Sequence, residues 1–158
     1  MIQLVVDSTA AVPKDFLEQH DNVHVIPLFI SVKGEYVPEN EATIEQVIEY
    51  SESTKKAVPT SQPSTGDFLK LFESLPKEDP VIVICITSGV SGTYNGAVLA
   101  ARQSGRKQIA VINSRTTAVG MMEVLEDGLD MIEKGLSFEE ISKGLQESAS
   151  LMRTTFTV

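Results

Sequence analysis

A run of six apolar residues at positions 81–86 limits the possible folds of this chain more than any other feature. Its sequence is Val-Ile-Val-Ile-Cys-Ile, and a short apolar run between turn-forming residues is typical of a fully buried strand. Glycine and hydroxyl residues dominate positions 87–93, and the stretch 94–103 then favours a helix. The run therefore predicts a central strand that leads through a polar turn into a helix.

Predicted strands and helices alternate along the whole chain. Apolar residues at helical spacing behind capping residues such as Thr43, Ser64 and Ser137 predict helices between the apolar strand-like runs. Such alternation implies an α/β protein with three layers, in which helices cover both faces of a mostly parallel sheet. We expect strands at residues 2–6, 23–32, 81–86 and 108–112, and helices at 13–19, 43–50, 64–75, 94–103, 118–134 and 137–150.

Three segments interrupt this alternation. Pro27 lies inside the apolar run 23–32. Because proline cannot donate a ladder hydrogen bond, we expect part of this run to lie at a sheet edge or in a bulge. Residues 33–35 predict a turn, and residues 35–37 predict a short return strand. Residues 51–64 are polar and contain two prolines, so we interpret them as a loop.

Composition and charge narrow the class of protein. The 158 residues suffice for one domain, and the formal net charge of −9 disfavours nucleic acid or an anionic membrane surface as the main partner. The single cysteine, Cys85, excludes an internal disulfide and is interpreted as an inert core thiol in a reducing compartment. No apolar run reaches the roughly 18–20 residues that span a membrane, and no signal peptide is recognisable. We therefore predict a cytoplasmic protein without a membrane span.

The turn after the central strand has the composition of an anion-binding site. The first N–H groups of a helix lack intrahelical partners, and the helix dipole is positive at that end. Ser91 and Thr93 add hydroxyl donors, while Gly89 and Gly92 let a ligand approach the backbone closely. A phosphate-ligand or nucleotide-binding domain is the alternative, although the sequence contains neither a P-loop nor a G-x-G-x-x-G motif.

Three polar turns, at residues 7–9, 88–93 and 113–114, each follow a predicted strand. Ligands of parallel α/β sheets bind outside the carboxyl ends of the strands, and the loop that carries Thr60 could fold over these turns. This convergence is the main functional signal. The acidic stretch 39–49 is interpreted as a solvated face.

A serine hydrolase and an interaction module without a small ligand are rival functions. The turn lacks the final glycine of G-x-S-x-G because Thr93 stands there, and both histidines, His20 and His24, precede Ser91. Neither histidine has cysteine or carboxylate partners at zinc-ligand spacing, so we expect no metal. A lipid that co-purifies would separate a ligand carrier from an interaction module.

Five segments resemble the DegV family of bacterial fatty-acid-binding proteins, and they occur in the family's order. The combination is specific, although each segment alone is weak, and the last one has asparagine where the family usually has aspartate. The segments are Asp7-Ser8-Thr9-Ala10 with Pro13, Ile26-Pro27-Leu28, Thr60-Ser61-Gln62-Pro63-Ser64, Ser91-Gly92-Thr93-Tyr94 and Asn113-Ser114.

The resemblance implies a non-catalytic protein that holds a long-chain fatty acid by its carboxylate, with no metal or other cofactor. Thr60 and Ser91 match the family's carboxylate-binding positions, and Ser88, Gly92 and Thr93 belong to the same turn. Some family members carry the fatty acid for a separate ATP-dependent fatty acid kinase subunit. The resemblance therefore implies a fatty acid as ligand and such a kinase subunit as a partner.

The chain ends in an alternating strand-like run at residues 153–158. This run predicts either a short edge strand of the same sheet or a piece that pairs with something outside the chain. Members of the resembled family are usually longer. The resemblance thus implies an amino-terminal α/β domain at residues 1–152 and the start of a second domain at 153–158.

Overall fold

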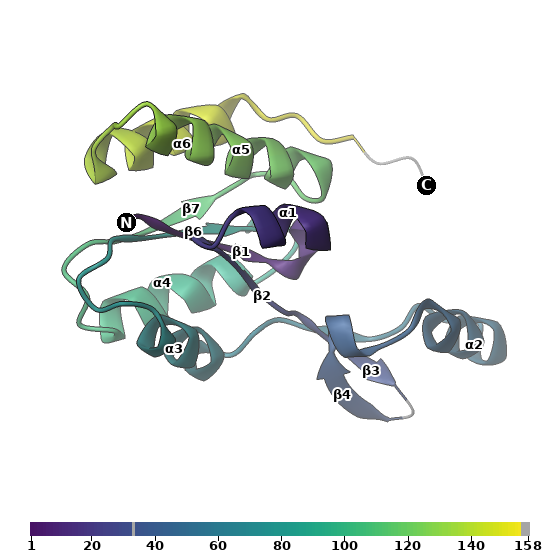
Figure 1. Ribbon diagram of the computed structural model, residues 1–158. Coiled ribbons are helices and arrows are strands. Elements are labelled where there is room, and N and C mark those ends of the chain that lie inside the picture. The colour runs from purple at the N-terminus through teal and green to yellow at the C-terminus, as the bar shows by residue number, and fades with distance from the viewer. Residues whose placement is uncertain (33, 156–158) are drawn as a thin grey trace.

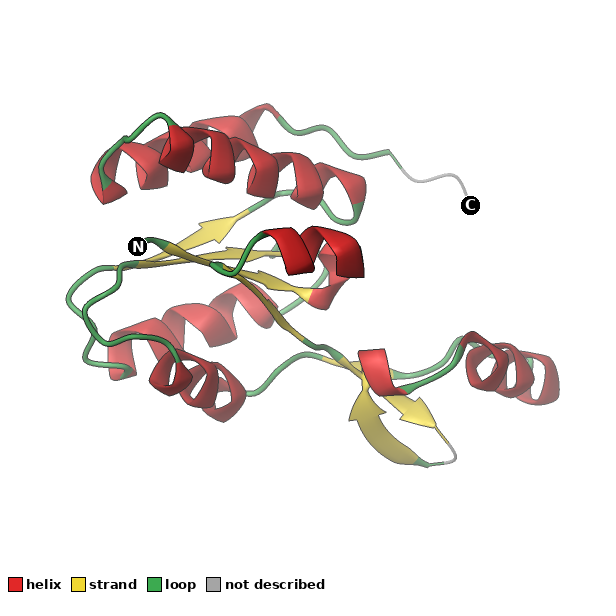
Figure 2. Cartoon of the chain, viewed as in Figure 1, coloured by secondary structure: helices red, strands yellow, loops and turns green. Residues whose placement is uncertain are grey.

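A computed structural model describes residues 1–32 and 34–155 of the chain (Figures 1 and 2). A four-stranded sheet in the order β2-β1-β6-β7 forms the middle of the molecule. All its strand pairs are parallel, so the four carboxyl ends lie at one edge. The strands are β1 (Gln3–Asp7), β2 (Val23–Ile26), β6 (Val81–Cys85) and β7 (Ile109–Asn113).

Helices cover both faces of this sheet, which confirms the predicted three-layer α/β/α architecture (Figure 1). Successive residues of a strand point to opposite faces. In β1, Leu4 and Val6 therefore pack with α1, α5 and α6, whereas Val5 packs with α3 and α4. The helices are α1 (Lys14–Gln19), α3 (Thr65–Ser74), α4 (Thr93–Gln103), α5 (Val119–Glu133) and α6 (Phe138–Leu151).

The central strand β6 is buried along its whole length, as its apolar sequence predicts. Cys85 at its end has no exposed surface, and burial raises the pKa of its thiol well above the usual value, with the nearby charge of Asp7 adding to the shift. A thiol that stays protonated is a poor nucleophile, which agrees with the interpretation of Cys85 as a core residue.

A second, antiparallel sheet stands apart from these layers, beyond the carboxyl ends of the parallel strands (Figure 1). The prediction of a single strand at residues 23–32 is wrong. The strand ends before Pro27, because proline has no N–H to donate to the hydrogen-bond ladder. After Pro27 the chain leaves the edge of the parallel sheet and enters the smaller sheet. The smaller sheet contains, in the order β4-β3-β5, β4 (Glu35–Pro38), β3 (Phe29–Val32) and β5 (Thr60–Ser61).

The predicted loop at residues 51–64 is partly wrong for a related reason. Helix α2 (Ile44–Thr54) extends into it, and β5 forms within it by pairing with β3. The predicted return strand at 35–37 is confirmed as β4, while Lys33 of the turn before it lies outside the described residues. Pairing with a partner distant in sequence thus adds a strand where the local sequence predicts none.

The predicted helix caps are confirmed. Thr43, Ser64 and Ser137 each accept a hydrogen bond from the N–H three residues later, and the side chain at that position bonds the cap residue's own N–H. Of the strand-like run at 153–158, residues 153–155 belong to no helix or strand, and 156–158 lie outside the described residues. Within the described part of the chain, no helix combines the length and apolarity that crossing a membrane requires.

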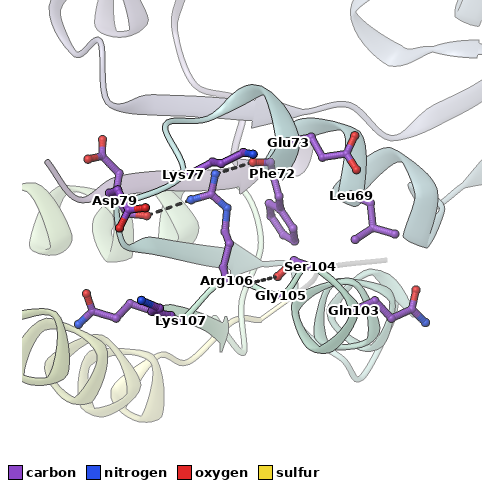
Figure 3. A pocket seen from close by; sticks show the side chains of 12 residues that line it. Leu69, Phe72, Glu73, Lys77, Asp79, Gln103, Ser104, Gly105, Arg106 and Lys107 are labelled. Carbon is purple, nitrogen blue, oxygen red and sulfur yellow. Dashed lines mark hydrogen bonds between the residues drawn. The ribbon is translucent and has the colours of Figure 1, made fainter.

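At the amino-terminal edge of the parallel sheet, Arg106 closes the end of α3 (Figure 3). Its guanidinium group donates four hydrogen bonds, between 2.5 and 3.0 Å long, to main-chain carbonyls. Arg106 and Phe72 also line a cavity of about 570 Å³ between the ends of α3 and α4. The four acceptors are the carbonyls of Phe72, Leu75, Pro76 and Asp79.

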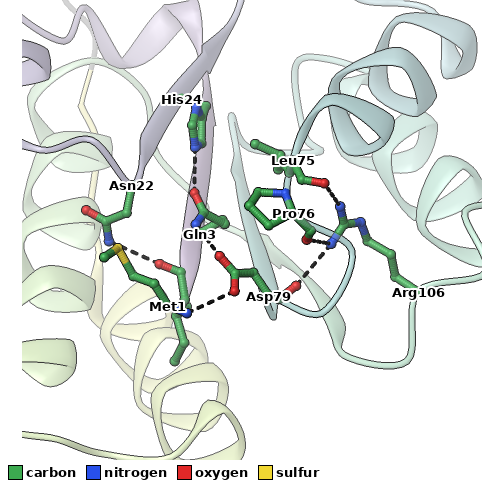
Figure 4. A network of polar contacts seen from close by, with 9 residues as sticks. Met1, Gln3, Asn22, His24, Leu75, Pro76, Asp79 and Arg106 are labelled. Atoms are coloured by element: carbon green, nitrogen blue, oxygen red, sulfur yellow. Dashed lines mark hydrogen bonds and ion pairs between the residues drawn. The ribbon is translucent and has the colours of Figure 1, made fainter.

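The side chain of Asp79 extends this network to the start of β1 (Figure 4). It accepts hydrogen bonds from the amino group of Met1 at 2.9 Å and from Nε2 of Gln3 at 2.7 Å. These two bonds lower the pKa of Asp79. On the other side, Oε1 of Gln3 lies 2.7 Å from Nε2 of His24. The network fixes the edge of the sheet that lies opposite the predicted site.

Candidate functional site

One cleft at the carboxyl edge of the parallel sheet holds both Thr60 and Ser91. Its volume is about 420 Å³, and it lies between the end of β1, the small sheet and the turn from β6 to α4. The segments that carry Thr60 and Ser91, about 30 residues apart in the sequence, therefore meet at this cleft. The lining residues are Thr9, Leu28, Ile30, Glu39, Thr60, Ser61, Gln62, Ile86, Val90, Ser91 and Gly92.

Thr60 lines the cleft because β5 pairs with β3. Thr60 lies opposite Ile30 in this antiparallel pair. Just before it, the carbonyl of Pro59 accepts a 2.9 Å hydrogen bond from the N–H of Ser31. The backbone around Thr60 is thus held by the small sheet, while its side chain is exposed and can meet a ligand.

The turn before α4 orients Ser91. The N–H groups of Val90 and Ser91 both donate to the carbonyl of Thr87, which closes the turn. The Ser91 hydroxyl accepts a 3.2 Å hydrogen bond from the N–H of Thr93 and lies 2.9 Å from the Thr93 hydroxyl. Gly92 is the N-cap residue of α4 and supplies no side-chain cap. Ser91 thus bonds the first N–H of the helix, while Gly92 adds no side-chain acceptor for the N–H groups that follow at this positive end of the helix dipole.

Ser88 and Thr93 do not line this cleft. The Ser88 hydroxyl accepts a 2.7 Å hydrogen bond from Nδ2 of Asn113, and the Ser88 N–H donates to Oδ1 of the same residue. Thr93 is fully buried behind Ser91. Of the three predicted polar turns, 7–9 and 88–93 contribute lining residues, and 113–114 supports the second of them from outside the cleft.

Asp7 joins the carboxyl ends of β1 and β6 beside the cleft. Its side chain is fully buried; Oδ2 accepts a 2.6 Å hydrogen bond from the N–H of Ile86, and Oδ1 accepts from the N–H and the hydroxyl of Thr9. Thr9 and Ile86 both line the cleft. The sequence predicts a polar turn at residues 7–9; the structure shows that Asp7 caps this turn and also links two strands.

Burial raises the pKa of Asp7, because desolvation disfavours the carboxylate more than its hydrogen bonds favour it, and the charge of Glu39 adds to the increase. The folded protein therefore binds a proton at Asp7 at a higher pH than the unfolded chain does. As the pH falls through the folded-state pKa towards 3.8, the usual pKa of an aspartate, this residue should add stability, and as the pH rises it should lose that contribution.

The prediction is measured as the difference in unfolding free energy between the wild type and Asp7→Asn over a pH series. We expect the unfolding free energy of the wild type to increase relative to that of the variant as the pH falls towards about 4. A difference that stays constant, or that shrinks on acidification, would contradict the assignment of a raised pKa.

Glu39 is a lining residue that the interpretation of 39–49 as a solvated face misses. It is exposed, yet its Oε2 accepts a 2.6 Å hydrogen bond from the Ser8 hydroxyl, which in turn accepts from the N–H of Leu28. Among the cleft's lining residues, only Glu39 carries a charge. Within residues 1–32 and 34–155, no group of three or more histidine, cysteine or acidic side chains could hold a metal ion.

Comparisons with known proteins agree with the resemblance seen in the sequence. The model of the DegV family, described as an uncharacterised protein family, matches residues 1–158. A DegV domain-containing protein of Staphylococcus aureus is 36% identical over 144 residues, which cover 90% of this chain and 50% of the relative. The chain thus spans about half the length of this relative.

Solved structures show the same fold. The crystal structure of DegV from Bacillus subtilis, described as a fatty acid binding protein, matches with a TM-score of 0.82 and 32% identity, covering 94% of this chain and 54% of that one. The structure of a stearic acid-binding protein from Eubacterium ventriosum matches with a TM-score of 0.81 and 31% identity, covering 92% and 52%.

Proposed function

The chain belongs to the DegV family, and on that basis we propose that it binds a long-chain fatty acid by its carboxylate in the cleft between Thr60 and Ser91. One observation carries the proposal: two hydroxyls from separate segments line a single cleft, in a chain similar to proteins described as binding fatty acids. In this proposal Ser91 acts as a binding group and not as a nucleophile, since the described residues that line the cleft include no histidine or lysine that could serve as a general base.

The donors around the cleft suit a carboxylate. An ionised carboxylate that loses water without gaining partners is strongly destabilised, so converging donors are needed. The hydroxyls of Thr60 and Ser91 and the N–H groups at the start of α4 can supply them. Hydrogen bonds to a charged group contribute about 1.5–3 kcal/mol each. The head group would therefore be oriented by neutral donors and a helix dipole.

Apolar side chains on the same walls suit the start of an acyl chain. Leu28, Ile30 and Val90 line the cleft, and Val90 leaves 68% of its surface exposed. Each methylene that an apolar surface removes from water contributes about 0.8 kcal/mol. The acyl chain would thus supply much of the affinity, while the polar groups set its direction.

Charge argues against a polyphosphate ligand in this cleft. Among its lining residues there is no lysine, arginine or histidine, and Glu39 adds a negative charge. A nucleotide or another multiply charged phosphate would meet this repulsion with no cationic side chain among the lining residues to offset it, whereas a singly charged head group meets less of it. We extend the proposal to presentation: a carboxylate held by neutral donors stays accessible to a separate fatty acid kinase subunit.

Extraction and mass spectrometry of lipid from freshly purified protein test the ligand class, and a Ser91→Ala variant tests the site. The variant is expected to weaken oleate binding by about 1–3 kcal/mol, roughly 5- to 150-fold, because one donor is lost and Thr93 loses its partner. Titration calorimetry of delipidated protein measures this change.

Ser150→Ala is the matched control for that titration. It removes a hydroxyl that bonds the carbonyl of Glu147 within α6, far along the chain from the cleft segments. Its oleate affinity should equal that of the wild type. Equal oleate affinities for the wild type and Ser91→Ala would contradict the assignment of the binding site to this cleft.

A further inference from the structure

Gln62 lies where the two walls of the cleft touch. A Cβ atom on Gly92 would lie 3.0 Å from Cδ and 3.1 Å from Nε2 of Gln62, and closer still to its Oε1. The carboxamide is therefore packed directly against the N-cap residue of α4. Only a glycine at position 92 permits this approach.

The carboxamide of Gln62 is free to serve a ligand. Gln62 is exposed and lines the cleft. Its main-chain carbonyl accepts a 3.3 Å hydrogen bond from the Ser61 hydroxyl, but its side-chain amide bonds no group in residues 1–32 and 34–155. The amide lies against Gly92, and its two N–H donors and its carbonyl acceptor keep their bonding capacity.

The charge of the cleft explains why a neutral amide suits this position. Glu39 lines the same cleft, so a bound carboxylate already faces one negative charge. An amide donor compensates that repulsion, whereas a second carboxylate would increase it. We infer that Gln62 donates a hydrogen bond from Nε2 to the carboxylate of the bound fatty acid, and that Gly92 positions it. This inference rests on the proposed function.

Two substitutions of similar size separate hydrogen bonding from packing. Gln62→Met keeps the length of the side chain but removes its donors, and Gln62→Glu keeps the shape but replaces the donors by a charge. We expect oleate affinity at pH 8 to fall about 10-fold in the methionine variant and about 30-fold or more in the glutamate variant. A residue that only packed against Gly92 would tolerate methionine with little loss, whereas the glutamate variant reports whether position 62 faces the charged head group.

Oleyl alcohol, which has a long chain but no charge, is the second probe. Repulsion by a glutamate at position 62 acts on the ionised head group, so Gln62→Glu should lose affinity for oleate while changing that for oleyl alcohol less than about 3-fold. Damage to the shape of the cleft would weaken both ligands equally.

Gly92→Ala provides an independent variant. Its methyl group should push the flexible end of Gln62 aside, which costs little stability but removes the amide from the ligand. We expect about a 10-fold loss of oleate affinity, with a melting temperature within about 2 °C of the wild type. Combining it with Gln62→Met should add little further loss, because both changes remove one interaction.

The outcomes separate the two claims. If wild-type protein binds oleate and Gln62→Met binds it equally well, or Gln62→Glu loses oleate and oleyl alcohol by the same factor, the role of Gln62 is refuted and the proposed function stands. If the delipidated wild type binds no oleate, the proposed function fails, and the inference fails with it.

Discussion

Replacing Asp7 by alanine is expected to lower the free energy of unfolding by about 3 kcal/mol. The substitution removes the acceptor of hydrogen bonds from Ile86 and Thr9, and each buried donor left without a partner costs about 1–3 kcal/mol. Loss of the desolvation cost of the buried carboxylate offsets part of this. Urea unfolding should show a lower midpoint with an unchanged slope.

Two further variants test whether the loss of stability comes from the hydrogen bonds by which Asp7 links β1 and β6. Asp7→Asn keeps one acceptor oxygen and should fall between the wild type and the alanine variant. Asp21→Ala, at an exposed turn, should change stability by no more than about 0.5 kcal/mol. Equal losses from Asp7→Ala and Asp21→Ala would show that Asp7 does not hold the strands together.

Replacing Arg106 by alanine is expected to cost about 2–4 kcal/mol of unfolding free energy. Its guanidinium group satisfies four carbonyls at and beyond the end of α3, among them those of Phe72 and Leu75. The positive charge also interacts favourably with the negative end of the helix dipole. Arg106→Lys should recover only part of the loss, because a single ammonium group cannot reproduce the planar fork.

Lys107→Ala is the control, since Lys107 is an exposed cation that lines the same cavity (Figure 3). It should leave the unfolding midpoint nearly unchanged. Because Arg106 lies at the edge opposite the cleft, folded Arg106→Ala protein should bind oleate with wild-type affinity. A stability loss below about 1 kcal/mol would mean that water replaces the guanidinium group at these carbonyls.

Together these variants show how the two edges of the parallel sheet differ in their contributions to stability and to ligand binding. Asp7→Ala should reduce both stability and ligand binding, because Thr9 and Ile86 line the cleft. Arg106→Ala should reduce stability alone. Calorimetric titration of each variant at a temperature where it remains folded measures the contrast.

Local sequence predicts the elements whose stability depends on near neighbours. The apolar run of β6 is stable only where helices cover both of its faces, so its sequence alone predicts a buried strand. The caps Ser64 and Ser137 form hydrogen bonds with groups only three residues away. Because the ends of parallel strands share one edge, the sequence also predicts that the polar turns at 7–9 and 88–93 lie together. These features require no knowledge of which distant segments touch.

Contacts between distant segments decide the rest. The strand β5 forms because Thr60 pairs with Ile30. Pro27 lies where the chain passes from one sheet to the other, rather than in a bulge. Gln62 belongs to the segment 60–64 that resembles the DegV family, but its contact with Gly92 depends on how that segment packs against α4.

The sequence by itself determined the alternation of strands and helices, the helix caps and the edge of the sheet where a ligand would bind. Only the tertiary structure decided that Thr60 and Ser91 line one cleft, that Asp7 links two strands and that Glu39 faces the same space. The reason is physical: caps and strand burial follow from neighbours along the chain, whereas a cleft is formed by side chains whose proximity arises only when the layers pack.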